Sequence, residues 1–162
     1  MPSETPPSIS ASCSAICAAV AGSVVVVLGY RRDRVAHPLD AAGLVIPRVE
    51  GRAALAISFS SSKFPQRAPE GHVLLRGFLG GGRDPHRTDG TDEELSAAVT
   101  AALTEIMRID GAPVLTRVFR YPRQSPQYEV GHLQRVAAIE QRLSALPGLF
   151  LAGSGFRAIG IP

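Results

Sequence analysis

A chain of 162 residues, of which 45% are apolar, is long enough to form a globular domain or part of a larger one, and its composition excludes a disordered protein. Its 17 Lys and Arg residues against 14 Asp and Glu residues leave a net charge of only +3, and the arginines are spread along the chain. Nucleic acid binding is therefore not supported.

Near the amino terminus, a pair of cysteines bears on metal binding, and an uncharged stretch bears on the cellular location of the protein. Cys13 and Cys17 lie four residues apart without a second Cys or His pair to complete a metal site, so we interpret them as small helix-packing residues in a reducing compartment. The uncharged stretch 15–30 is shorter than the roughly 18 to 20 residues of a membrane-spanning helix, and no basic region precedes it. The sequence thus predicts a cytoplasmic protein without a metal site.

The first half of the chain predicts a sheet. We expect a disordered start over 1–7 and a helix of small residues over 8–21. Four consecutive valines then favour a strand over 23–30 that is buried on both faces. Three more strands are expected to follow one another as a meander, namely Gly43–Val49 with Pro47 at an edge or bulge, Ala53–Ser60, and His72–Leu79.

A well-marked helix follows the flexible connector Gly80–Gly82. Thr91 or Asp92 can cap its start, and apolar side chains recur at helical spacing until the helix ends near Asp110–Gly111. Alternation then predicts a half-buried strand over Pro113–Tyr121. This strand would place Arg117 on the same face as apolar neighbours, a placement that the sequence does not explain.

The last quarter of the chain predicts one helix and one strand. An apolar stripe indicates a helix over His132–Leu146, which Pro147 and Gly148 end. The four apolar residues Leu149–Ala152 predict a buried strand that runs into Gly153-Ser154-Gly155. These residues alone fit either an ordinary strand and turn or a close-approach segment for a phosphate-bearing or flat heterocyclic ligand.

This order of elements predicts an α+β fold. We expect an antiparallel-rich mixed sheet with helices on one side, joined to a final strand that belongs to another layer. The corresponding division is a disordered start and short helix over 1–22, the sheet and its helices over 23–146, and the final strand and turn over 147–162.

Several stretches together resemble one family, the flavoprotein protoporphyrinogen or coproporphyrinogen oxidases of haem synthesis, within the flavin amine oxidase superfamily. The stretches are GYRR at 29–32, HPLD at 37–40, SSKFPQRAPEGHVLLRGFLGG at 61–81, PQYEVGH at 126–132 and LPGLFLAG at 146–153. The resemblance implies an α/β flavoprotein that binds FAD, in which 23–146 belong to the substrate domain and 147–162 return to the FAD-binding domain.

The resemblance also implies which residues contact the cofactor. Tyr121 stands where the family has an aromatic residue beside the flavin ring. Ile159, Gly160 and Ile161 would line the flavin through their backbone, with Gly153 and Ser154 just before them. No residue is predicted to be catalytic, because the four histidines have no paired carboxylate in sequence reach.

The implied activity is the oxidation of a porphyrinogen to a porphyrin, with FAD accepting hydride and dioxygen as the final acceptor. No G-x-G-x-x-G follows a strand in the sequence, so we expect the chain to be a carboxyl-terminal portion that lacks the amino-terminal FAD-domain half and is inactive alone. A non-enzymatic binding or assembly module derived from the substrate domain is the alternative. The resemblance leaves peripheral membrane association, homo-oligomer formation and the choice of porphyrinogen open.

Overall fold

The computed structural model describes residues 20–82 and 84–157, and it divides into two compact units. The larger unit is Gly22–Gln124, and the smaller one contains the described residues from Ser125 onward. The helix expected over 8–21 falls mostly outside the described residues, although Val20 and Ala21 already belong to a strand. The domain division expected from the sequence remains a prediction.

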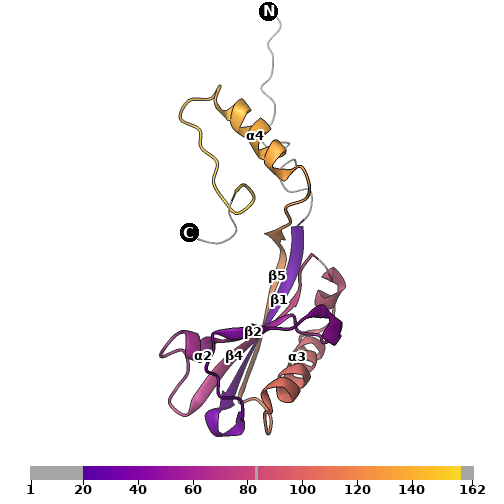
Figure 1. The fold of residues 1–162 in the computed structure, drawn as a ribbon, viewed down its shortest axis with the longest axis vertical. Coiled ribbons are helices and arrows are strands. Elements are labelled where there is room, and N and C mark those ends of the chain that lie inside the picture. The colour runs from indigo at the N-terminus through magenta and orange to yellow at the C-terminus, as the bar shows by residue number, and fades with distance from the viewer. Residues whose placement is uncertain (1–19, 83, 158–162) are drawn as a thin grey trace, which may run out of the picture. The chain divides into compact units, whose positions relative to one another are not determined.

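The larger unit is built on a five-stranded sheet in the order β2-β3-β4-β1-β5 (Figure 1). Its β1–β4, β2–β3 and β3–β4 pairs are antiparallel, which confirms the predicted meander. The strands are β1 Val20–Arg31, β2 Gly43–Val45, β3 Ala56–Phe59, β4 His72–Gly80 and β5 Leu115–Pro126.

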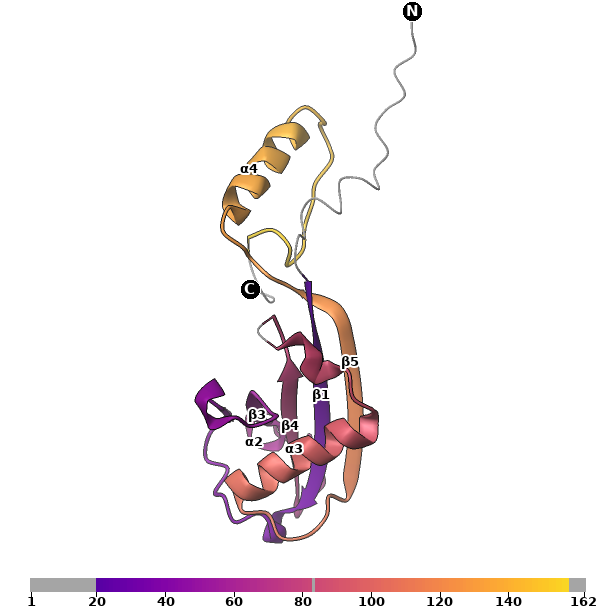
Figure 2. The ribbon, with the colours of Figure 1, turned by 90° about the vertical axis from the view of Figure 1, so that its right-hand side faces the viewer.

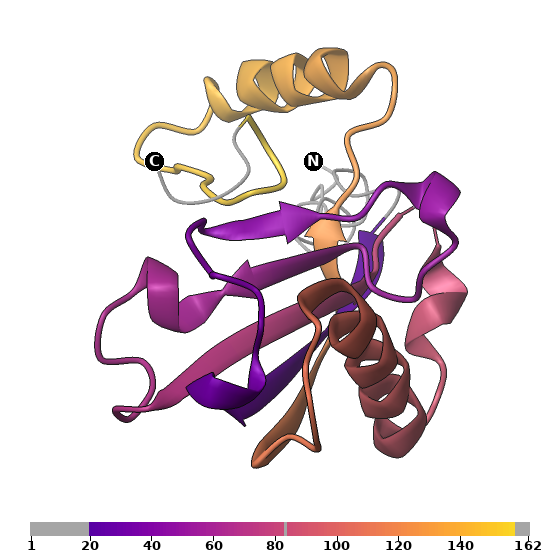
Figure 3. The same cartoon turned by 60° about the horizontal axis from the view of Figure 1, so that its bottom comes forward.

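One long helix covers one face of this sheet, as Figures 2 and 3 show from two directions. It is α3, Asp92–Met107, and Thr91 caps it in a reciprocal capping box with Glu94. The other helical segments are η1 Arg32–Arg34, η2 Arg48–Glu50, α2 Ser60–Lys63, η3 Pro85–Thr88 and, in the smaller unit, α4 His132–Leu143.

The hydrophobic core lies between α3 and the sheet. Val24, Val26 and Leu28 of β1 are at most 1% exposed, and Val99, Leu103 and Met107 of α3 are fully buried. Gly77 of β4 brings the helix close, because a Cβ placed there would lie 2.3 Å from Cγ1 of Val99. Since successive side chains of a strand alternate between faces, the neighbours of the buried valines lie on the other side of the sheet.

The structure differs from the predicted elements of the larger unit in several places, and β5 runs to Pro126 instead of ending at Tyr121. The strand predicted to be buried on both faces is fully buried on the α3 side only, because Val25 and Val27 on the other side are half-buried. The strand expected over 43–49 is only Gly43–Val45, since Pro47 has no N–H to donate and η2 follows it. The short helix α2 lies between β3 and β4, where the sequence predicted no helix. The helix expected to end near Asp110 ends at Met107, where Arg108 adopts a left-handed conformation and Ile109 bridges to Val35.

The smaller unit departs most from expectation. Helix α4 begins at His132 as predicted but ends at Leu143. Leu149–Ala152, predicted to be a strand, is not assigned to one in the described residues, and Leu149, Phe150 and Leu151 are 49%, 88% and 47% exposed. A strand is defined by its hydrogen-bonded neighbour, and this segment pairs with none in the described part of the chain. Its apolar sequence is therefore not sufficient to make it a strand.

Candidate functional site: an open sheet face

The face of the sheet opposite α3 carries exposed apolar side chains, and we call it the open face. Leu115, Phe119 and Tyr121 of β5 are 38%, 48% and 40% exposed there. On β1, β4 and β5 the side chains of the open face are Val25 and Val27, then Leu74, Arg76 and Phe78, and then Leu115, Arg117, Phe119 and Tyr121. An exposed apolar patch of this kind is typical of a binding surface.

The side on which each β5 residue lies follows from its contacts. Val118 packs against the core and Arg120 reaches the start of α3, so these two side chains lie on the α3 side. The alternate positions Arg117, Phe119 and Tyr121 therefore lie on the open face. This explains the unexpected position of Arg117 among apolar residues, because that face is not part of the hydrophobic core.

The open face also contains a depression over β2 and β3, at the edge of the sheet opposite β5. A shallow depression of about 310 Å³ is lined by residues of β2 and β3 together with Phe78 of β4. Its floor is apolar, with Ala56 and Phe78 at directly opposed positions of neighbouring strands. An apolar, weakly curved surface of this type suits a flat ligand better than a compact, highly charged one.

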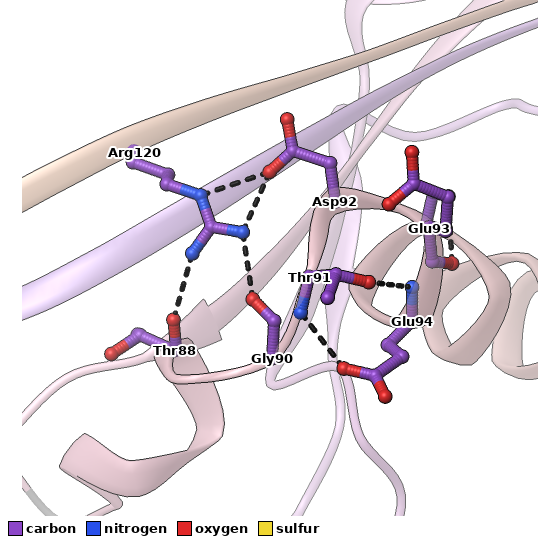
Figure 4. A network of polar contacts seen from close by, with 8 residues as sticks. Thr88, Gly90, Thr91, Asp92, Glu93, Glu94 and Arg120 are labelled. Carbon is purple, nitrogen blue, oxygen red and sulfur yellow. Dashed lines mark hydrogen bonds and ion pairs between the residues drawn. The ribbon is translucent and has the colours of Figure 1, made fainter.

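Strand β5, which carries Tyr121, is tied to the start of α3 by Arg120 (Figure 4). The guanidinium donates from Nε and Nη2 to Oδ1 of Asp92, at 2.9 and 2.6 Å. It also donates to the carbonyl oxygens of Thr88 and Gly90, at 3.0 and 2.7 Å. These charge-assisted bonds tie the edge strand β5 to the start of α3 from the α3 side of the sheet.

Replacing Arg120 with methionine should lower the free energy of unfolding by about 1 to 2 kcal/mol, because four hydrogen bonds to a partly exposed guanidinium are lost while its aliphatic stem remains. Urea denaturation measures this change. The same substitution at the exposed Arg123 of β5 is the matched control and should change stability by less than about 0.5 kcal/mol. Equal stability of the two variants would contradict the role given to Arg120.

In the smaller unit, two aromatic side chains hold the segment that follows α4. Tyr128 and His132 stack with ring centroids 4.1 Å apart and an interplanar angle of 8°. The Tyr128 hydroxyl donates to the carbonyl oxygen of Ser154, and Nε2 of His132 lies 2.5 Å from the carbonyl oxygen of Phe156. Since a carbonyl only accepts, this nitrogen carries the proton of the bond. The motif PQYEVGH thus fixes the backbone over 154–156.

An exposed ion pair adds to this arrangement. Arg157 donates from Nε to Oε1 of Glu140 at 3.0 Å and from Nη2 to Oε2 at 2.5 Å. The hydrogen bond with Arg157 lowers the pKa of the Glu140 carboxyl. A lowered pKa means that the contribution of the pair is present at neutral pH and is lost only when the carboxyl is protonated in acid. The pair therefore links α4 to the following segment at physiological pH.

The predicted site residues fall into three groups in the structure. Tyr121 lies on the open face, in the larger unit. Gly153 and Ser154 lie in the smaller unit, where Gly153 has a φ of 134° and open space around its Cβ position. Ile159, Gly160 and Ile161 are outside the described residues. The cofactor contacts predicted for all six remain predictions.

Sequence reasoning missed other residues of interest. Arg76 was not singled out, Tyr128 was quoted only as a letter of a motif, and His132 was considered only as the start of a helix and as a histidine without a paired carboxylate. Their sequence signal was PQYEVGH itself, whose tyrosine and histidine are four residues apart and so can stack. Among the residues described, His, Cys, Asp and Glu form no group of three that could hold a metal ion. No helix in those ranges is long and apolar enough to cross a bilayer.

Comparison with known proteins shows the family to which the chain belongs. The family model of the flavin containing amine oxidoreductases matches residues 5–159, nearly the whole chain, and the chain belongs to this family. The resemblance seen in the sequence and the α+β character of the fold are thereby confirmed. The family is flavin-containing, which agrees with the predicted kind of cofactor.

Among the individual relatives that the chain resembles are enzymes named as porphyrinogen oxidases. The chain is 36% identical over 138 residues to the coproporphyrinogen III oxidase of Bacillus subtilis, a match that covers 85% of this chain and 29% of that enzyme. It is 30% identical over 133 residues to protoporphyrinogen oxidase 2 of Arabidopsis thaliana, covering 80% of this chain and 26% of the relative. The chain thus spans less than a third of the length of these relatives.

Solved structures agree on the fold. A protein from Exiguobacterium sp. 255-15, assigned as a protoporphyrinogen oxidase, superposes with a TM-score of 0.73 at 27% identity over 87% of this chain and 31% of that chain. A reduced UDP-galactopyranose mutase superposes with a TM-score of 0.62 at 14% identity over 78% of this chain and 26% of that chain. The second likeness shows the fold alone.

Proposed function

We propose that the chain is the substrate-domain portion of an FAD-dependent oxidase that converts a porphyrinogen to a porphyrin, with dioxygen as the final electron acceptor. The observation that carries this proposal is the open face, an exposed apolar surface that ends in the aromatic ring of Tyr121. A porphyrinogen is a broad apolar macrocycle, and a sheet face offers it contact over several strands at once.

Two of the described residues, Tyr121 and Gly153, are compatible with a bound flavin. Tyr121 is an exposed aromatic side chain, and Gly153 leaves open space where a flat heterocycle could approach its backbone. We propose FAD contacts at Tyr121, Gly153, Ser154, Ile159, Gly160 and Ile161, and protein outside these 162 residues completing the cofactor site. The flavin would supply the hydride-accepting ring, and the residues of this chain would bind and orient the macrocycle.

The proposal also covers the cellular location of the protein, its association with membranes or other copies, and the activity of the 162 residues alone. The protein is expected in the cytoplasm, and association with a membrane surface or with a second copy of the chain stays a prediction. The 162 residues alone are not expected to oxidise substrate, because no dinucleotide fingerprint follows a strand in them.

A chimeric enzyme tests the proposal. The matched 138-residue segment of the Bacillus subtilis coproporphyrinogen III oxidase is exchanged for the corresponding residues of this chain. We expect the purified chimera to show flavin absorbance and to convert coproporphyrinogen III or protoporphyrinogen IX to the fluorescent porphyrin. Tyr121→Ala in the chimera should lower kcat/KM by about ten- to a hundredfold, because an aromatic contact of about 1.5 to 3 kcal/mol is lost.

The control is Val49→Ala, at a side chain that is 93% exposed in η2, and it should leave kcat/KM unchanged within about twofold. A folded, flavin-containing chimera that forms no porphyrin from either substrate would contradict the proposed activity. A folded chimera without flavin would instead favour the non-enzymatic module.

A further inference from the structure

Two arginines of the open face, Arg76 and Arg117, form no ion pair in the described part of the chain. Seven arginines form ion pairs there, namely Arg31, Arg34, Arg52, Arg87, Arg120, Arg135 and Arg157. Arg76 and Arg117 are not among them. Nε of Arg76 is buried without a hydrogen-bond partner, and Arg117 donates only to the carbonyl oxygen of Thr116, at 2.9 Å.

These two arginines lie in one row across the sheet. Arg76 is directly opposite Val27 of β1. A Cβ added at Gly29 would contact Leu115, and one added at Gly22 would lie 3.8 Å from Cα of Pro122, so β5 runs antiparallel to β1. This register puts Arg117 opposite Val27 on the other side. With strands about 4.8 Å apart, the Cα atoms of the two arginines are about 10 Å apart.

Apart from Ser58, which is directly opposite Arg76 on β3, their surroundings are apolar. The guanidinium of Arg76 lies over the ring of Phe78, 5.7 Å from its centroid, and Arg117 lies between Leu115 and Phe119 on its strand. The adjacent rows hold valine, leucine, phenylalanine and glycine, and none of these positions is acidic. The buried Nε of Arg76 lacks a hydrogen-bond partner, which is costly, and an anion bound over this row would offset that cost, while the exposed Arg117 could reach the same anion or a second one.

We propose that Arg76 and Arg117 bind carboxylate groups of the ligand while the apolar rows beside them hold its macrocycle. This inference rests on the proposed function, because a porphyrinogen combines a broad apolar ring with acidic side chains. Arginine suits the task because its planar fork can donate two parallel hydrogen bonds to one carboxylate. The pair would thus distinguish acidic tetrapyrroles from uncharged ones and fix the orientation of the ring on the sheet.

Binding of stable porphyrins to the full 162-residue chain tests the pair. The probes are coproporphyrin III, with four carboxylates, and its tetramethyl ester, with none, in the same low concentration of detergent. Dissociation constants come from the shift of the porphyrin absorption band on titration with protein. We expect the acid to bind at least tenfold more tightly than the ester.

The variants are Arg76→Gln, Arg117→Gln and the double replacement. Each single variant should weaken binding of the acid about tenfold, and the double about a hundredfold, while binding of the ester changes less than about twofold. Arg76→Lys keeps the charge and loses the fork, so its affinity for the acid should be intermediate. Arg48→Gln, at an exposed arginine of η2, is the matched control and should bind both probes as the unmodified chain does.

The two proposals fail in different ways. If the acid and the ester lose affinity equally in the variants, or if the variants bind the acid as before, the arginines do not recognise carboxylates, although the open face still binds the macrocycle. If the unmodified chain binds neither probe, both the carboxylate pair and the macrocycle surface are wrong. Thermal melts of each variant establish that a loss of affinity is not a loss of folding.

Discussion

Gly77→Ala should destabilise the larger unit by about 1 to 3 kcal/mol, although it adds a single methyl group. A Cβ at this position would lie 2.3 Å from Cγ1 of Val99, well inside contact distance. Val99 cannot turn away, because a β-branched side chain in a helix has one strongly preferred rotamer. The clash can be relieved only by moving α3 or β4, which disturbs the packed core. Urea denaturation followed by circular dichroism measures the loss.

A double-mutant cycle isolates the cause. Val99→Ala alone also costs stability, because it leaves a cavity at a fully buried site. Gly77→Ala combined with Val99→Ala should be more stable than the sum of the single effects by at least about 1 kcal/mol, since the added methyl group fills the vacated space. Gly22→Ala, where the nearest atoms are 3.7 to 3.8 Å away, is the control and should be nearly neutral. Strict additivity in the cycle would show that the close approach is not what makes glycine necessary.

Leu103→Ala is expected to cost about 2 to 5 kcal/mol, a large fraction of the roughly 5 to 15 kcal/mol that stabilises a domain of this size. Leu103 is fully buried in α3 and belongs to the cluster that joins the helix to the sheet. Its loss removes apolar contacts and leaves a cavity that the rigid strands can fill only in part. The measurement is again the free energy of unfolding in urea.

Leu115→Ala is the matched comparison on the opposite face of the same sheet. Leu115 is 38% exposed, so its truncation should cost less than about 1 kcal/mol of stability. It should nevertheless weaken coproporphyrin III binding, because the side chain belongs to the open face. Similar unfolding costs for the two leucine variants would mean that the two faces do not differ in the way the burial pattern indicates.

The α3 side of the sheet was largely predictable from the sequence. The valine run, the meander and the helix that Thr91 caps appear as expected, because each depends on local signals such as β-branched residues, turn residues and a capping box. The family was also recognisable from SSKFP and PQYEVGH. The strand over 149–152 was not predictable, because apolar residues form a strand only where a neighbouring strand is present to accept their hydrogen bonds.

The sequence by itself determined the order of elements in the larger unit and the family, since these follow from residues that are adjacent or closely spaced in the chain. The cofactor residues that the resemblance implies remain predictions. Only the tertiary structure decided which face of the sheet is covered, and hence that Arg117, which looks misplaced in the sequence, faces away from the core. It also decided that Arg76 and Arg117, 41 positions apart, lie in one row beside Val27. The physical reason is that strand register and helix packing join residues that are distant in the chain, and no local pattern encodes which side chains meet.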